Sequence, residues 1–165
     1  QAQLIREGNV LGDWVKITPY GSAIIYGRSD ATINRHGIRM GTADIYRVVE
    51  DAPDVADSLV VDLEYLGKPS CMILFLKLSE GAAWSEDRQS ALIADLKARV
   101  SPHHVPDRIA VAPDIPYTLT GKKLEGPIKK RLLGRAMADV VTPDAMGNPE
   151  CLEWYDEYAR GVGDS

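Results

Sequence analysis

The chain of 165 residues is 45% hydrophobic and 26% charged, proportions that are typical of a globular protein with a core of its own. Its formal net charge of -5 argues against a general nucleic-acid binder, which needs a basic surface to face phosphates. No apolar stretch is long enough to cross a bilayer and no signal region stands at the start, so we expect a cytoplasmic protein without membrane or nucleic-acid partners. Because the first residue is Gln rather than Met, we also expect a fragment of a longer protein.

The first forty residues predict two short β-ribbons. Residues 10–17 and 22–26 have strand character and are joined by a Pro-Tyr-Gly turn. Residues 32–34 and 38–40 form a second pair of strands, with a His-Gly turn between them.

A helix and two longer strands follow. Thr42 is suited to cap the helix N-terminus, and Pro53 ends the helix. The apolar stripe at helical spacing consists of Ile45, Val48, Val49 and Ala52. Residues 59–65 alternate between apolar and polar side chains. Residues 71–78 are almost continuously apolar, which predicts a central strand covered on both faces.

The rest of the chain predicts three more helices or helical turns and one more strand. Ser85 caps a helix that ends at residues 101–102, and its buried stripe is Leu92, Ile93, Leu96 and Val100. Residues 108–112 form a short strand. Another helix begins at residues 126–127, where Pro is tolerated, and residues 151–160 form a terminal helix. The inward side chains of the helix after residue 126 are Ile128, Leu132 and Leu133.

This order of elements predicts the fold class. After residue 34 it reads strand, helix, strand, strand, helix, strand, helix. The natural packing is an α+β fold, in which a small mixed β-sheet has helices packed on it and is preceded by a short β-hairpin ribbon.

The charges are unevenly distributed along the chain. Residues 50–64 contain no Lys or Arg, and their acidic side chains are Glu50, Asp51, Asp54, Asp57, Asp62 and Glu64. Against the single acidic Glu125, residues 121–135 contain Lys122, Lys123, Lys129, Lys130, Arg131 and Arg135. Each run is typical of a solvated face. The functional alternative is that the basic segment meets an anion and the acidic segment does not.

The cysteines and histidines give no functional signal. Cys71 lies in an apolar run and Cys151 in a polar tail, so neither a disulfide framework nor a metal spacing follows. His103 and His104 are adjacent and are expected in an exposed loop. We therefore predict no metal site.

Lys122 follows Gly121 at the tip of a predicted loop over residues 113–121. A lysine there is a mobile positive charge that reaches a phosphate or a carboxylate. The Gly-Lys pair lacks the first glycine and the Ser or Thr of a phosphate-binding loop, so on its own an ordinary surface loop explains it better. Asp13, near a strand end, is likewise either a turn residue or an acceptor for a ribose diol.

Three segments taken together resemble the adenylate-forming enzymes, which include acyl- and aryl-CoA synthetases, firefly luciferase and peptide-synthetase adenylation domains. The first segment is Gly12-Asp13, and the last, residues 116–122, has the form Pro-x-x-x-x-Gly-Lys. The middle motif Gly-Arg-x-Asp-x-x-Ile-x-x-x-Gly-x-Arg is matched by Gly27, Arg28, Asp30, Ile33, Gly37 and Arg39. The long middle motif is specific, and together the segments favour a catalytic Lys122 over a surface loop.

The terminal segment narrows the resemblance to the acetoacetyl-CoA synthetase branch. Residues 115–125 and the extension over residues 148–155 are similar to that branch. Lys123 and Glu125 stand where acetate-activating relatives tend to have aliphatic and basic residues. Two alternatives stay open: a synthetase for acetate, propionate or a longer acid, and a noncatalytic module that binds a nucleotide or an acidic partner through Lys122 and the basic helix.

The resemblance implies a two-step ligase and a division of the chain. A carboxylate, acetoacetate in this branch, attacks ATP to give an acyl-adenylate and pyrophosphate, and CoA then gives the thioester and AMP. Residues 1–29 would end the large N-terminal adenylation domain, residues 30–140 would form a mobile C-terminal domain, and residues 141–165 would be an extension. The fragment alone would be inactive, because its partner is that large domain.

The resemblance also implies roles for single residues on the nucleotide side. Asp13 would bind the ribose hydroxyls, Arg28 would lie near the ribose and α-phosphate, and Arg39 would contact phosphate. Asp30 would be the hinge between two arrangements of the domains. Lys122 would be the catalytic residue that stabilises charge during adenylation.

For the second step the resemblance implies a CoA site. Gly37, which has no side chain, would let pantetheine pass, with His36 beside it. Lys97 or Arg99 would reach the nucleotide phosphates of CoA. The implied ligands are ATP, CoA, a short 3-oxo acid and Mg²⁺, bound mostly through the large domain.

Overall fold

A computed structural model describes residues 6–10, 13–17, 23–28, 32–35, 38–64 and 70–163. By its internal contacts the chain divides into two compact units, Gln1–Thr32 and Ile33–Ser165. The predicted division at residues 30 and 141 stays a prediction.

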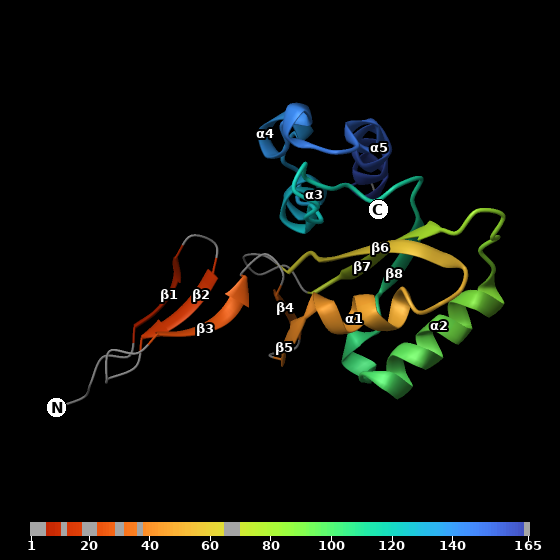
Figure 1. Ribbon diagram of the computed structural model, residues 1–165, viewed down its shortest axis with the longest axis horizontal. Coiled ribbons are helices and arrows are strands. Elements are labelled where there is room, and N and C mark those ends of the chain that lie inside the picture. Colours follow the sequence, from red (N-terminus) through yellow and green to blue (C-terminus); the bar gives the residue numbers. More distant parts are fainter. Residues whose placement is uncertain are drawn as a thin grey trace. The chain divides into compact units, whose positions relative to one another are not determined.

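The first unit contains a three-stranded antiparallel sheet in the order β1-β2-β3 (Figure 1). Its strands are β1 (Arg6–Val10), β2 (Asp13–Ile17) and β3 (Ala23–Arg28). The pairing of β2 with β3 confirms the predicted hairpin, but the single strand predicted over residues 10–17 is wrong. Val10 ends one strand and Asp13 begins the next. Residues 6–10 lack an alternating pattern and contain Gly and Asn, which are poor strand formers, so only pairing with β2 makes them a strand.

The second predicted ribbon is confirmed. It is a two-stranded sheet of β4 (Thr32–Arg35) and β5 (Ile38–Gly41). Ile33 and Met40 are buried in the core of the second unit. The Arg35 guanidinium donates to the Val105 carbonyl at 2.8 Å and pairs with Asp107 at 2.7 Å, which ties β4 to the segment that precedes the last strand of the main sheet.

The main sheet has the order β6-β7-β8 and consists of β6 (Val55–Asp62), β7 (Met72–Leu78) and β8 (Arg108–Val111). The central strand β7 is antiparallel to β6 and parallel to β8. The mixed sheet and its central strand are therefore as predicted. The strand predicted at residues 59–65 begins earlier, at Val55, because Val55 and Asp57 still pair with the far end of β7.

In the described part of the chain the helices are α1 (Thr42–Val49), α2 (Glu86–Arg99), α3 (Glu125–Leu132), α4 (Met137–Val140) and α5 (Leu152–Gly163). Short 3₁₀ turns are η1 (Pro102–His104), η2 (Pro143–Ala145) and η3 (Pro149–Cys151). Ser85 caps α2 as predicted, since its hydroxyl accepts from the Arg88 amide. Thr42 is not the N-cap of α1: Gly41 takes that position without a side-chain bond, and buried Thr42 is the first helical residue. None of these helices is long and apolar enough to span a bilayer.

Helices cover both faces of the main sheet (Figure 1). On β7, Met72 and Leu74 point to a core shared with α1 and α2. Ile73 and Phe75 point to the opposite core, shared with α3 and α5. Because alternate residues of a strand face opposite sides, the nearly continuous apolar run of β7 is explained by this three-layer packing and the predicted α+β fold is confirmed.

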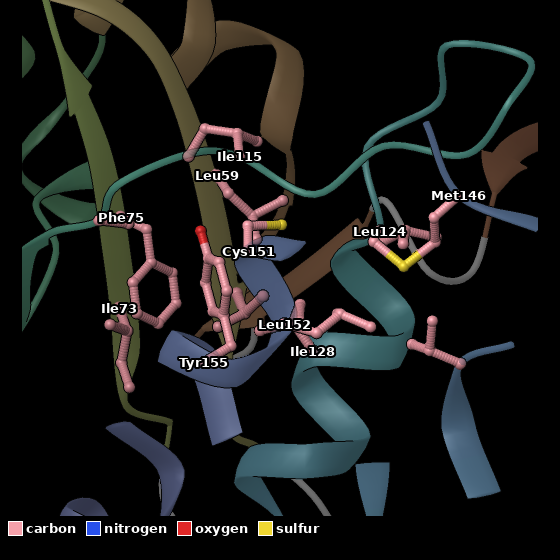
Figure 2. Packing of buried hydrophobic residues seen from close by; sticks show 13 residues of the cluster. Leu59, Ile73, Phe75, Ile115, Leu124, Ile128, Met146, Cys151, Leu152 and Tyr155 are labelled. Atoms are coloured by element: carbon pink, nitrogen blue, oxygen red, sulfur yellow. The ribbon is translucent and has the colours of Figure 1, made fainter. Parts of the chain in front are cut away.

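The last part of the chain is an integral part of the second core (Figure 2). Tyr155, only 1% exposed, packs edge-to-face on Phe75 with ring centroids 5.1 Å apart. Cys151 is buried beside them, which corrects its placement in a polar tail, and burial raises the pKa of its thiol to about 11. The other buried residues from this part of the chain are Val141, Met146, Leu152 and Ala159.

Candidate functional site

Lys122 lies on a closed hairpin between β8 and α3, formed by residues 117–123 and called here the Lys122 hairpin. Tyr117 and Lys123 form an antiparallel β-bridge at its base. The Thr118 amide donates to the Lys122 carbonyl at 2.9 Å, and the Gly121 amide donates to the Thr118 carbonyl at 2.9 Å. The predicted loop is therefore an ordered turn.

Two residues shape the tip of the hairpin. Gly121 has φ of +77°, a left-handed backbone conformation that costs a residue with a side chain about 1–2 kcal/mol. The Thr118 hydroxyl accepts the Lys122 amide at 3.0 Å and lies 3.0 Å from the Thr120 hydroxyl. The backbone of Lys122 is thus held by its own turn.

Residues 145–148 support the outer strand of the hairpin. The Leu119 amide donates to the Ala145 carbonyl and the Gly147 amide to the Tyr117 carbonyl, each at 3.0 Å. The Asn148 side chain accepts the Tyr117 amide at 3.0 Å. A stretch without a clear sequence pattern is therefore bound along the hairpin, where Met146 forms an isolated antiparallel β-bridge with Thr118.

Asn148 is itself anchored through Asp114. Its amide nitrogen donates to Asp114 Oδ2 at 3.0 Å and to the Ile115 carbonyl at 2.7 Å. Lys77 of β7 pairs with Asp114 at 2.7 Å. Partial burial alone would raise the pKa of Asp114, but the hydrogen bonds from Lys77, Asn148 and the Ile115 amide outweigh it and hold this pKa below its ordinary value.

The inner strand of the hairpin is anchored by Lys123. The Lys123 ammonium lies 2.5 Å from Glu50 Oε1 and 2.9 Å from Asp57 Oδ1. It also donates to the Ser58 carbonyl at 2.6 Å. The Lys123 side chain is 17% exposed, so its charge is satisfied in a largely desolvated position.

Two tyrosines complete this anchor. The Lys123 ammonium lies 4.0 Å from the centre of the Tyr46 ring, a cation–π contact. The Tyr46 hydroxyl donates to Glu125 and accepts the Val60 amide at 3.1 Å. Burial, followed by the nearby Glu125 carboxylate, raises the pKa of Tyr46. The Tyr117 hydroxyl donates to Asp57 Oδ2 at 2.7 Å, and burial and this bond raise the pKa of Tyr117 in the same way.

Lys122 has the opposite environment from its neighbour. Its side chain is exposed, and no carboxylate of the described residues lies within ion-pair distance of its ammonium group. The hairpin therefore holds Lys123 inward and leaves Lys122 exposed at the surface.

The other predicted nucleotide-side residues lie mostly in the first unit. Asp13 and Arg28 are directly opposite each other in the β2–β3 ladder, next to an irregularity between Trp14 and Val15. Arg39 is in β5. Asp30, His36 and Gly37 lie outside the described residues, so the predictions for them stay predictions.

Lys97 and Arg99 are not brought together with Lys122. They lie in the last turn of α2, on the sheet face opposite to α3. Lys97 is exposed, whereas Arg99 pairs with Asp51 at 2.5 Å.

The sequence does not predict the contacts that the acidic run over residues 50–64 makes in the fold. This run was expected to be a solvated face, but its members are largely engaged. Glu50 and Asp57 bind Lys123, while Asp51 and Asp54 pair with arginines of α2. The complementary signs of residues 50–64 and 121–135 were the available signal, because opposite charge runs can pair across the fold. The described residues contain no cluster of three or more His, Cys, Asp or Glu suited to a metal.

Comparisons with known proteins find CoA synthetases as relatives of this chain. Acetoacetyl-CoA synthetase of Caenorhabditis elegans is 40% identical over 149 residues, which are 89% of this chain and 21% of that protein. Malonamoyl-CoA synthetase of Penicillium aethiopicum is 36% identical over 156 residues, which are 90% of this chain and 21% of that protein. No family model matches the chain.

A solved structure shares the fold as well. Acetoacetyl-CoA synthetase from Streptomyces lividans superposes with a TM-score of 0.75 at 40% identity, and the match covers 91% of this chain and 22% of that one. The chain thus spans about a fifth of the length of the relatives it matches.

Proposed function

We propose that this chain, which is a region of an adenylate-forming enzyme as its motifs predicted and its relatives confirm, supplies the catalytic cation of an acyl-CoA ligase. The observation that carries the proposal is the contrast within the hairpin: Lys123 is bound by carboxylates, and exposed Lys122 has no described acidic partner. An exposed ammonium group on an ordered turn is suited to approach a phosphate without first breaking an ion pair.

The proposed reaction has two steps. The substrate carboxylate attacks the α-phosphate of ATP, which forms the acyl-adenylate and releases pyrophosphate. The CoA sulfur then attacks the acyl carbon, which forms the thioester and releases AMP. Displacement at phosphorus depends mainly on positioning and on neutralising charge, and a fixed cation serves both.

The remaining nucleotide-side roles are proposals carried over from the motifs. Asp13 binds the ribose hydroxyls, and Arg28, its partner in the β2–β3 ladder, lies near the ribose and α-phosphate. Arg39 contacts phosphate. Mg²⁺ would accompany ATP, bound mostly through the large N-terminal domain, and would neutralise phosphate charge.

The hinge and CoA-side roles are carried over from the motifs as well. Asp30 is the proposed hinge, and Gly37 with His36 borders the pantetheine path. Lys97 on α2 is better placed than Arg99 to meet a CoA phosphate, because Arg99 already pairs with Asp51. The large N-terminal domain is the proposed partner that holds most of the ATP, CoA and acid.

The proposed acid is acetoacetate. The relatives named above act on acetoacetate and on malonamate, and both acids carry a carbonyl group at carbon 3. Assays of the full-length parent with acetoacetate, malonamate, acetate and propionate test this choice. Preference for acetate or propionate would overturn the 3-oxo acid while leaving the ligase chemistry intact.

Lys122→Ala in the full-length parent tests the catalytic role. Adenylate formation, measured as ATP–pyrophosphate exchange, should fall by about 10²–10³-fold, because a fixed cation is lost from the transition state. Thioester formation from a supplied acyl-adenylate should change little. The matched control is Lys130→Ala, which removes an exposed lysine of α3 and should leave both half-reactions intact. Equal losses in the two half-reactions of Lys122→Ala would contradict the proposal.

A further inference from the structure

Lys123 connects the Lys122 hairpin directly to α1 and β6. Its ammonium group binds Glu50 at the end of α1 and both Asp57 and Ser58 of β6. Glu125, in the first turn of α3, shares Tyr46 with it. These contacts join residues more than sixty positions apart in the sequence.

Lys122 and Lys123 are adjacent in the hairpin, and the carboxylates of Glu50 and Asp57 bind the Lys123 ammonium group. Lys123 forms the β-bridge at the base of the hairpin and points inward, whereas Lys122, next to the Gly121 turn, is exposed. Glu50 and Asp57 are only 37% and 20% exposed, and partly desolvated carboxylates attract a cation strongly. Without Lys123 they would keep the hydroxyls of Ser58 and Tyr117 as hydrogen-bond donors but would lose their cation, with Lys122 as the nearest other cation in sequence.

We infer that Lys123 is a positioning residue for Lys122, a role that rests on the proposed catalytic function. It holds the inner strand of the hairpin on β6 and occupies the carboxylates that would otherwise capture the Lys122 ammonium group. Lys122 is thereby kept outward and available for the α-phosphate. Tyr46 and Glu125 fix the geometry of this anchor.

The test compares Lys123→Met with Lys123→Arg in the full-length parent. Met keeps much of the apolar stem but removes the charge, whereas Arg keeps the charge and can bridge both carboxylates. We expect Lys123→Met to lower kcat for ATP–pyrophosphate exchange by about 10–100-fold, because small displacements of a catalytic group have effects of that size. KM for ATP and thioester formation from supplied acyl-adenylate should change less than about threefold. Lys123→Arg should recover most of the exchange rate.

A second set of variants tests capture by the carboxylates directly. Adding Glu50→Gln and Asp57→Asn to Lys123→Met removes the competing charges, so exchange should recover at least in part. Hydrogen exchange of the segment 117–124, followed by mass spectrometry in the full-length protein, should be faster in Lys123→Met than in the parent. The matched control Lys130→Met should alter neither measurement.

The outcomes separate this inference from the proposed function. If Lys122→Ala abolishes adenylation but Lys123→Met behaves like Lys130→Met, the positioning role is overturned and the catalytic role stands. If Lys122→Ala itself has no selective effect on adenylation, the proposed function fails first. Equal loss of both half-reactions in Lys123→Met, with no rescue by Arg, would reduce Lys123 to a structural residue and overturn the inference.

Discussion

At the scale of single residues, the role of a polar side chain in this protein depends on the partners that the fold places beside it. Asp114 is an example. It receives hydrogen bonds from Lys77 and Asn148, and through Asn148 it stabilises the outer strand of the Lys122 hairpin. Because these hydrogen bonds also hold the hairpin in place, the free energy of unfolding depends on whether the Asp114 carboxylate is charged.

Asp114→Asn should lower the free energy of unfolding by about 1–2 kcal/mol at pH 7, since it loses charge-assisted hydrogen bonds at a partly exposed site. The pKa of Asp114 is lower in the folded protein than its ordinary value of 3.8. Its stabilising contribution is therefore complete above that ordinary value and is lost as the pH falls through the folded pKa. Urea unfolding at pH 7 and pH 3 measures the difference.

The control for that comparison is Asp144→Asn, which changes an exposed carboxylate in the same part of the chain. Its effect should be small at both pH values. A destabilisation by Asp114→Asn that is equally large at pH 7 and well below pH 3.8 would show that the charge of Asp114 does not contribute.

At the scale of elements, the last helix does more than extend the chain. Tyr155 of α5 packs on Phe75 of the central strand, and its hydroxyl donates to the Asp114 carbonyl at 3.1 Å. Trp154 and Tyr158 stack on each other and meet Phe75 at its edge. Phe75 is therefore enclosed by aromatic side chains that come from residues 154–158.

Tyr155→Ala should destabilise the protein by about 3–5 kcal/mol, the usual effect of removing a buried aromatic ring. Tyr155→Phe keeps the ring and loses one hydrogen bond, so about 1 kcal/mol is expected. Thermal unfolding of both variants measures the separate contributions of the ring and of the hydroxyl. Glu153→Ala, on the exposed side of α5, is the control. If Tyr155→Ala and Tyr155→Phe lower the free energy of unfolding by similar amounts, the aromatic ring is not the main source of the stabilisation.

At the scale of the whole molecule, the second unit presents two different helical faces around one sheet. Helix α3, which directly follows the Lys122 hairpin, covers one face, and α2, which contains Lys97, covers the other (Figure 1). Under the proposed function, these two faces would serve the two half-reactions. The chain spans about a fifth of the length of its relatives, and the proposed function assigns most of the reaction site to the large N-terminal domain.

The isolated 165-residue chain should therefore show no ATP–pyrophosphate exchange, although a cooperative unfolding transition should show that it is folded. The full-length parent, assayed at the same concentration, is the positive control. Exchange by the folded chain that disappears in Lys122→Ala would contradict the need for a large partner domain.

The sequence alone determined much of the fold. The apolar run of residues 71–78 predicted a central strand because burial on both faces removes the alternation of polar residues. Local signals also located the α2 cap at Ser85 and the ribbon around β4 and β5. They failed at β1, whose residues have little strand preference and become a strand only through pairing.

The motifs likewise singled out Lys122 among many lysines and identified the family, because spacing along a chain preserves a site's geometry. Only the tertiary structure decided which of two adjacent lysines pairs with carboxylates of the described residues and which is exposed. The partners of Lys123 are Glu50 and Asp57, more than sixty residues away, and no local periodicity reports a contact over that distance. The acidic and basic runs were visible in the sequence, but their pairing depends on how β6 and the Lys122 hairpin pack, which long-range burial determines.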